Sequence, residues 1–213
     1  MMSEESFREI IEINENMIKE NNELKQEIER LKQINELLRA KNEFYQIEAQ
    51  TDKTTGLYNK NAFQAQVENL SNVESCNILV VIDIDDFKFI NDSFGHPEGD
   101  YVLNKLGQLL KESIRQSDLA GRFGGDEFIL FLRKIDIHNA HDLLERILKK
   151  INTIKMPNNE ILISTSIGFV EYDSTISYEE NFKKADEALY YSKNHGKNQV
   201  NYYNPAINTN KKR

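Results

Sequence analysis

The order of hydrophobic and polar residues divides the chain into two parts with different periods. In the first fifty residues, apolar side chains recur at every seventh position, namely Ile10, Met17, Leu24, Leu31, Leu38 and Tyr45. The positions three residues before these are Phe7, Asn14, Asn21, Ile28, Asn35 and Asn42. The two series correspond to the d and a positions of a heptad repeat, and this segment contains no Gly or Pro. The pattern predicts one long coiled-coil helix over residues 1–50.

The charged residues beside this heptad seam favour a parallel homodimer through residues 1–50. Glu20 and Glu27 fall at g positions, and Lys25 and Lys32 fall at the e positions five residues further on. Opposite charges at g and e pair between two parallel helices. Asn at an a position costs stability but fixes the alignment, so we expect a weak coil with a well-defined register. The alternative is a single amphipathic helix that lies on its own domain.

After residue 50, short stretches with helix and strand periods alternate. Polar residues predict a turn over 51–56, and Asn59 suits the N-cap of a helix that carries Phe63, Val67 and Leu70. Strands are expected over 78–82, 118–123, 127–132, 161–170 and 200–203. Further helices are expected just before Gly95, from Pro97 onward, and over 138–152 and 178–194. The predicted fold class is α/β, with a mixed sheet flanked by helices over residues 51–204 and a polar tail over 205–213.

Composition narrows the class of protein. Asp and Glu exceed Lys and Arg by 35 to 27, which argues against nucleic-acid binding driven by positive charge. The single Cys76 allows no disulfide within the chain and no cysteine zinc cluster, and it is expected to be a small core residue. No apolar run is long enough to cross a membrane, and the residues after Met1 lack the features of a secretory signal. We expect a cytoplasmic protein without a nucleic-acid or membrane partner.

Carboxylates are concentrated where the predicted sheet ends. Asp83 follows an aliphatic strand directly, and Asp126 and Glu127 follow the paired Gly124 and Gly125 at the tip of a predicted hairpin. With the main-chain carbonyl of Ile84, these three side chains would make an all-oxygen site suited to Mg²⁺. Each cluster taken alone is more typical of a solvated surface loop.

The joint order of these motifs resembles the GGDEF diguanylate cyclase domain. The resemblance covers about 150 residues. It includes Asp52 to Lys60, Asp83 to Asp92, Gly95 to Asp100, Gly124 to Phe128, and Ala185 to Tyr190 with Lys193 and Lys197. The family has a fold similar to nucleotidyl cyclase and polymerase palm domains. Its members join two GTP molecules into cyclic di-GMP and release two pyrophosphates.

The resemblance implies roles for the acids and the glycines. Asp83, the Ile84 carbonyl, Asp126 and Glu127 would hold two Mg²⁺ ions per active site, which Mn²⁺ can replace, and the ions would activate the attacking 3′-hydroxyl. A general-base role is also implied for Asp126, although a metal-bound alkoxide needs no separate base. Gly124 and Gly125 would let the backbone approach the nucleotide closely.

Base and phosphate recognition follow from the same resemblance. Asn91 and Asp100 would bind guanine, because an Asp carboxylate accepts hydrogen bonds from guanine N1–H and N2–H₂ whereas the unprotonated N1 of adenine repels it. Lys193 and Lys197 would neutralise phosphates, and Lys193 would take part in catalysis. Lys88 and the backbone around Phe87 would contact the distal phosphates. The family usually has Arg at the position of Lys197, and Lys keeps the charge but lacks the bidentate guanidinium.

The resemblance also implies regulation. Arg115 and Asp118 stand at the spacing before Gly124 that the family uses for a product-binding inhibitory site. Two half-sites must meet to close the cyclic product, so the homodimer becomes part of the mechanism, and a signalling partner could act on the coil. Two alternatives stay open. One is a non-catalytic receptor for GTP or cyclic di-GMP, and the other is a coiled-coil scaffold with an inert domain.

Overall fold

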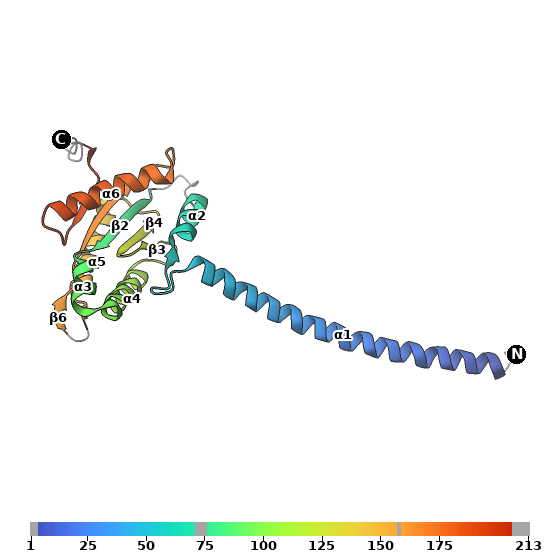
Figure 1. Ribbon diagram of the computed structural model, residues 1–213. Coiled ribbons are helices and arrows are strands. Elements are labelled where there is room, and N and C mark those ends of the chain that lie inside the picture. The colour runs from blue at the N-terminus through green and yellow to red at the C-terminus, as the bar shows by residue number, and fades with distance from the viewer. Residues whose placement is uncertain (1–3, 71–75, 157–158, 206–213) are drawn as a thin grey trace. The chain divides into compact units, whose positions relative to one another are not determined.

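The computed structural model of the protein describes residues 4–70, 76–156 and 159–205 (Figure 1). The chain forms two compact units, with the boundary between Ala49 and Gln50. The first unit is helical, and the second contains the sheet and the other helices.

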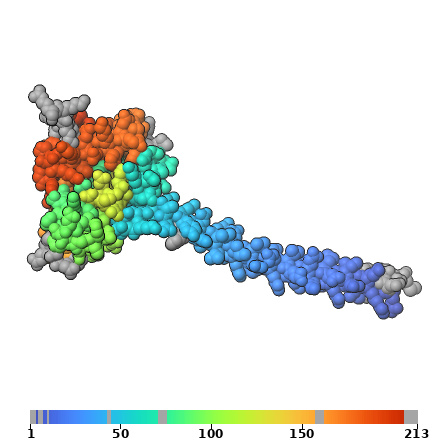
Figure 2. All heavy atoms as spheres, viewed as in Figure 1, coloured from blue at the N-terminus to red at the C-terminus, as the bar shows by residue number. Residues whose placement is uncertain are grey.

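Helix α1, Glu4–Gln50, is 47 residues long and forms the first unit except for its last residue. Every α1 side chain that the structure describes is exposed, and Figure 2 shows them in blue. The exposed residues include the apolar d positions Met17, Leu24, Leu31, Leu38 and Tyr45, whereas the side chains of Phe7 and Ile10 lie outside the described ones. The predicted helix is therefore present and carries an uncovered apolar seam, while its pairing with a second copy stays a prediction.

The second unit is built around a six-stranded mixed sheet with the strand order β1-β3-β4-β2-β7-β8. The strands are β1 (Tyr58–Asn59), β2 (Ile78–Ile84), β3 (Leu119–Gly124), β4 (Glu127–Leu132), β7 (Thr165–Glu171) and β8 (Val200–Tyr202). The central strand β2 is antiparallel to both β4 and β7. The outer pairs β1–β3 and β7–β8 are parallel. The predicted α/β class with a mixed sheet is confirmed.

Helices cover both faces of the sheet because the side chains of β2 alternate between two hydrophobic clusters. One cluster takes Ile78, Val80, Ile82 and Ile84 together with helices α3 (Phe87–Phe94), α4 (His96–Ser113) and α5 (Ile137–Ile151). The other takes Leu79 and Val81 with helices α2 (Lys60–Leu70) and α6 (Tyr178–Asn194). In Figure 1, α6 lies on one side of β2 and β4, and α4 lies on the other. Asp83 follows the same alternation, which directs it to the α6 side.

Helix α6 packs unusually close to β7 because residue 168 is glycine. A Cβ atom at Gly168 would lie 2.0 Å from the amide nitrogen of Leu189 and 2.4 Å from the carbonyl oxygen of Ala185. No side chain could occupy this position without moving the helix backbone. Gly168 thus sets the depth of α6 over the sheet, and α6 carries Lys193 in its last turn.

Local signals at the helix ends agree with the sequence. The side chain of Asn59 accepts a hydrogen bond from the Ala62 amide at 3.0 Å, which confirms the predicted N-cap of α2. Helix α6 begins with a capping box in which Ser177 and Glu180 bind each other's backbone amides. Pro97 lies in the first turn of α4, as predicted.

Some predicted details are wrong. The strand predicted from residue 161 is in fact two elements, because β6 (Asn159–Leu162) pairs with β5 (Lys155–Met156) in a separate two-stranded sheet and β7 starts at Thr165. Strand β1 was not predicted, because two residues are too few to show a periodic pattern. Cys76 is exposed rather than buried, since β2 begins two residues later.

Among the helices in the described part of the chain, none combines the length and apolar character that a bilayer span requires.

Candidate active site

The carboxyl end of β2 places Asp83 between two neighbouring strands. In the registers of the sheet, Asp83 lies opposite Glu127 on β4 and opposite Ser166 on β7. Directly opposed residues of antiparallel strands project from the same face, so the two carboxylates share the α6 side. Lys193 reaches this group from α6, and its Nζ lies 2.7 Å from Oδ2 of Asp83. The side chain of Asp83 is only 7% exposed, which makes this a buried carboxylate with one cationic partner.

The charges around Asp83 make the site favourable for a cation. The pKa of Asp83 is raised to about 6, chiefly by burial and also by the negative charges of Asp126 and Glu127, while the ion pair with Lys193 opposes the shift. Burial likewise raises the pKa of Glu127, and the charges of Asp186 and Asp126 add to that shift. Acids that disfavour one another's ionisation in this way bind a divalent ion readily, because the ion removes the repulsion.

The donor set fits an ion that is shared with a polyphosphate. Across the described residues, no three His, Cys, Asp or Glu side chains are arranged as a complete metal cage. Mg²⁺ seldom uses such a cage and is usually held by one or two carboxylates together with substrate phosphates and water. Asp83 and Glu127, which lie opposite each other, supply carboxylate oxygens of this kind, and Ile84 follows Asp83 at the end of β2.

The turn between β3 and β4, which leads into Glu127, has open space beside its two glycines. Gly124 and Gly125 have φ values of +142° and +54°, and an added Cβ atom at either position would meet no protein atom within 4 Å. Here glycine is required by backbone conformation and not by crowding within the protein. The backbone at the turn is therefore accessible to a ligand.

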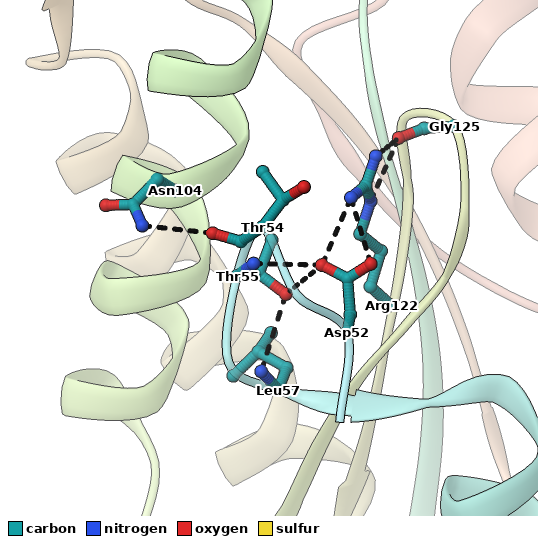
Figure 3. A network of polar contacts seen from close by, with 7 residues as sticks. All are labelled: Asp52, Thr54, Thr55, Leu57, Asn104, Arg122 and Gly125. Carbon is teal, nitrogen blue, oxygen red and sulfur yellow. Dashed lines mark hydrogen bonds and ion pairs between the residues drawn. The ribbon is translucent and has the colours of Figure 1, made fainter. Parts of the chain in front are cut away.

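Arg122 holds this turn in place. Its Nη2 and Nε donate hydrogen bonds to the carbonyl oxygen of Gly125 at 2.6 and 3.1 Å. Its Nη1 lies 3.1 Å from both carboxylate oxygens of Asp52, as Figure 3 shows. The planar guanidinium thus joins the glycine turn to the start of the second unit.

Asp52 is itself fixed by the turn that follows it. Its Oδ1 accepts hydrogen bonds from the amide and the hydroxyl of Thr55 at 2.9 and 2.7 Å. Burial acts to raise the pKa of Asp52, but the hydrogen bonds from Thr55 and Arg122 outweigh it and hold the pKa below its usual value. The side chain of Asn104 on α4 donates to the carbonyl of Thr54 at 3.0 Å, which ties the same turn to a helix (Figure 3).

The predicted guanine-binding residues lie where α3 and α4 meet. A Cβ atom at Gly99 would lie 2.0 Å from Oδ1 of Asn91, so the Asn91 amide rests against the backbone that leads into Asp100. Asp100 is exposed and Asn91 is half-buried. Of the two residues predicted near the distal phosphates, Lys88 is exposed, whereas the side chain of Phe87 is buried in the core, which leaves only its backbone for a contact.

The other predicted residues pair with groups other than Asp83. Lys197 is exposed, and its Nζ binds both carboxylate oxygens of Asp86 at 2.7 and 2.8 Å. Arg115 and Asp118 line a separate cavity of about 640 Å³. The carboxylate of Asp118 already accepts hydrogen bonds from the amides of Arg115 and Arg133, both at 3.0 Å, and therefore also has a structural role.

Sequence reasoning missed several residues that shape the site. Nothing assigned a role to Arg122, which is separated from Asp52 by 70 positions in the chain. Asp186 lies in one of the quoted motifs, but its electrostatic effect on Glu127 depends on the packing of α6. Asp85 and Asp86 were visible as part of an acidic run, which does not show which acid faces which partner.

Comparison with known proteins agrees with this geometry. A family model described as "Diguanylate cyclase, GGDEF domain" matches residues 49–199. Diguanylate cyclase DgcS of Shewanella oneidensis is 35% identical over 156 residues, which are 71% of this chain and 52% of DgcS. Diguanylate cyclase DgcM of Escherichia coli is 36% identical over 160 residues, which are 71% of this chain and 38% of DgcM. The chain thus spans about half the length of these relatives or less.

Solved structures have the same architecture. The coiled coil and GGDEF domain of DgcB from Caulobacter crescentus, in complex with c-di-GMP, has a TM-score of 0.75 at 28% identity. The match covers 84% of this chain and 98% of that one. Diguanylate cyclase SiaD from Pseudomonas aeruginosa, in complex with its activator SiaC, has a TM-score of 0.70 at 25% identity, with coverage of 92% and 78%. The family model spans more than two thirds of the sequence, and this chain belongs to the GGDEF family of diguanylate cyclase domains.

Proposed function

We propose that this chain is a diguanylate cyclase that condenses two GTP molecules into cyclic di-GMP and releases two pyrophosphates. The observation that carries the proposal is the pairing of Asp83 with Glu127 beside Lys193, at the end of a strand that follows an open glycine turn. Named diguanylate cyclases among the relatives support it, and the DgcB structure contains c-di-GMP.

Asp83, Glu127, Asp126 and the Ile84 carbonyl would hold the divalent ions, which fits the oxygen donors that converge there. Bound Mg²⁺ would supply charge neutralisation at the phosphates and lower the pKa of the attacking hydroxyl. Lys193 would then turn from Asp83 toward the phosphates. Asp126 is half-buried beside these groups and is the candidate for accepting the hydroxyl proton.

The nucleotide would be positioned by three surfaces. Asp100 would accept from guanine N1–H and N2–H₂, and Asn91 beside it would donate to O6 or N7. The open backbone of Gly124 and Gly125 would follow the ribose and phosphates, held in place by Arg122. Lys197 would meet the phosphate charge, with Lys88 and the Phe87 backbone at the distal phosphates.

Two copies are needed because each site would supply one 3′-hydroxyl and one α-phosphate to the ring. The exposed d positions of α1 give a surface that a second copy would cover in parallel. Pairing there raises the effective concentration of one half-site near the other. A partner that acts on α1 is also proposed, since the neighbour SiaD was solved with its activator.

Glu127→Gln should abolish product formation. Purified protein is incubated with GTP and Mg²⁺, and nucleotide products are identified by chromatography and mass spectrometry. We expect cyclic di-GMP from the natural sequence and at least about a hundredfold less from the variant, because a metal-binding carboxylate is lost. Glu171→Gln, at the exposed far end of β7, is the matched control and should behave normally. GTP binding without any turnover would favour the receptor alternative.

The raised pKa of Asp83 gives a pH dependence of stability. The folded state holds this proton more tightly than the unfolded state does, since the pKa rises from 3.8 to about 6. Its stabilising contribution is therefore present below about pH 4 and is lost as pH rises through 6. From about pH 5 to about pH 7, we expect the metal-free protein to lose stability relative to Asp83→Asn. Urea denaturation with a chelator at both pH values measures this, and parallel pH profiles would contradict it.

Charged residues at the d positions of α1 should dissociate the dimer into monomers. Leu24→Asp combined with Leu31→Asp places two carboxylates at d positions that are 57% and 55% exposed in the single chain. We expect monomers in sedimentation and loss of product at the same protein concentration. Leu37→Asp, at a 69% exposed position outside a and d, is the control and should stay dimeric. A monomeric natural protein that makes cyclic di-GMP would end the dimer proposal.

Product inhibition would act at the cavity lined by Arg115 and Asp118. Arg115 is exposed there and can bind phosphate or guanine through its guanidinium, and Arg146 lines the same cavity. The cavity is large enough for part of a dinucleotide.

Arg115→Ala should weaken inhibition by added cyclic di-GMP by about tenfold or more, since a charge-assisted contact is lost. Initial rates are measured over a range of product concentrations, with Lys111→Ala on the exposed part of α4 as the control. Equal sensitivity in both variants would contradict an inhibitory role for Arg115.

A further inference from the structure

The loop that carries Lys197 is anchored to the end of β2 by a buried acid, Asp85. Its side chain lies in the protein interior, where Oδ1 accepts a hydrogen bond from the hydroxyl of Ser166 at 2.7 Å. Oδ2 accepts from the hydroxyl of Ser164 at 2.9 Å and from the backbone amide of Asn198 at 3.1 Å. A buried carboxylate with three donors is a rigid support. The backbone next to Lys197 is therefore fixed without any ligand.

The backbone around Asp86 and Lys197 has an uncommon conformation. In the described part of the chain, the non-glycine residues with positive φ are Asp86 (56°), Lys134 (50°), Lys197 (57°) and Asn198 (47°). Three of these four, Asp86, Lys197 and Asn198, lie in two segments that contact each other. Asp85 binds the amide of Asn198, and Asp86 binds the side chain of Lys197. Left-handed conformations of non-glycine residues are unfavourable and persist where the surrounding structure enforces them. Lys197 is thus held in a defined direction by its own backbone.

The side chain of Lys197 is already paired in this direction. Its Nζ lies 2.7 and 2.8 Å from the two carboxylate oxygens of Asp86, a contact that involves both oxygens of one acid. The two side chains are 43% and 65% exposed. An exposed ion pair of this kind contributes little to stability, so a triphosphate can displace the carboxylate. After the charge of Asp86, the negative charges of Asp85 and Asp83 also act on Lys197.

We propose that Asp86 is an affinity-determining residue that neutralises Lys197 until the triphosphate of the nucleotide displaces it. This inference rests on the proposed function, because that function assigns Lys197 to the phosphates. Asp85 keeps the loop in place throughout, and Asp86 acts as a replaceable counter-ion. Binding of phosphate to Lys197 breaks the ion pair with Asp86, which offsets part of the attraction. The carboxylate of Asp86 also repels the incoming phosphate.

The consequence is an increase in affinity when an acid is removed. Asp86→Asn keeps the size of the side chain but removes its charge. Binding of an unreactive GTP analogue, with a methylene group between the α- and β-phosphates, is measured by calorimetry in the presence of Mg²⁺. We expect the variant to bind about two- to fivefold more tightly, the range that corresponds to an exposed ion pair. Glu112→Gln, which removes one charge from an exposed position on α4, should leave affinity unchanged.

A double-mutant cycle identifies the partner. In a Lys197→Ala background, Asp86→Asn should have a clearly smaller effect, because the cation that Asp86 neutralises is gone. Equal effects of Asp86→Asn in both backgrounds would overturn the role of the pair. Unchanged or weaker binding by the single variant would also overturn it. Asp86 would then either have no effect on affinity or increase affinity by aligning Lys197 for the phosphate.

The outcome can be separated from that of the proposed function. If the natural protein makes cyclic di-GMP and Asp86→Asn leaves analogue affinity unchanged, only the inference about Asp86 fails. If the protein makes no cyclic di-GMP but Asp86→Asn still tightens binding through Lys197, the inference holds and the cyclase proposal fails. If the natural protein and the variant both fail to bind the analogue, the two proposals fall together.

Discussion

The burial of two opposed carboxylates, Asp83 and Glu127, is the constraint on which the rest of the second unit depends. The two carboxylates lie opposite each other on β4 and β2 and share one face of the sheet. Burial and the negative charge of Asp126 disfavour the charged forms of both carboxylates, and Lys193 offsets only part of that cost. An arrangement like this lowers the stability of the protein without its ligands. It is maintained because the surrounding sheet is stable enough to hold it, and β2 is buried along its whole length.

The parts around these acids serve to fix their geometry. Ladder hydrogen bonds with β4 and β7 fix the backbone on both sides of Asp83. The short distance between β7 and α6 fixes Lys193, and Arg122 fixes the turn through Gly125. Asp83 and Glu127 stand on strands and Lys193 on a helix, whereas Gly125 and Lys197 lie in the connections between elements. Sites that need accurate placement are more precise on regular elements than on loops.

Much of this could be predicted from the sequence, for reasons that are local. The heptad spacing of α1, the aliphatic run of β2, the Asn59 cap and the glycine pair each depend on neighbours within a few residues. The pairing of Asp83 with Glu127 could be suspected only from the joint order of the motifs. Contacts between distant segments could not be read in this way. Arg122 with Asp52 and Lys197 with Asp86 depend on how the sheet and its loops fold, and no periodic pattern encodes them. The exposed Cys76 was misplaced because composition gives the average burial of a residue type and not the residue at which a strand begins.

Gly168 shows how little freedom this part of the chain has to change over evolutionary time. Where two side chains meet, a substitution on one can be absorbed by a compensating substitution on the other. At Gly168 the neighbour is main chain, the amide of Leu189 and the carbonyl of Ala185, and main chain offers no compensating variant. Divergence at this contact is therefore limited to the helix moving as a whole, and such a movement would carry Lys193 away from Asp83. Gly168 does not take part in the chemistry, yet the position of Lys193 beside Asp83 depends on residue 168 remaining glycine.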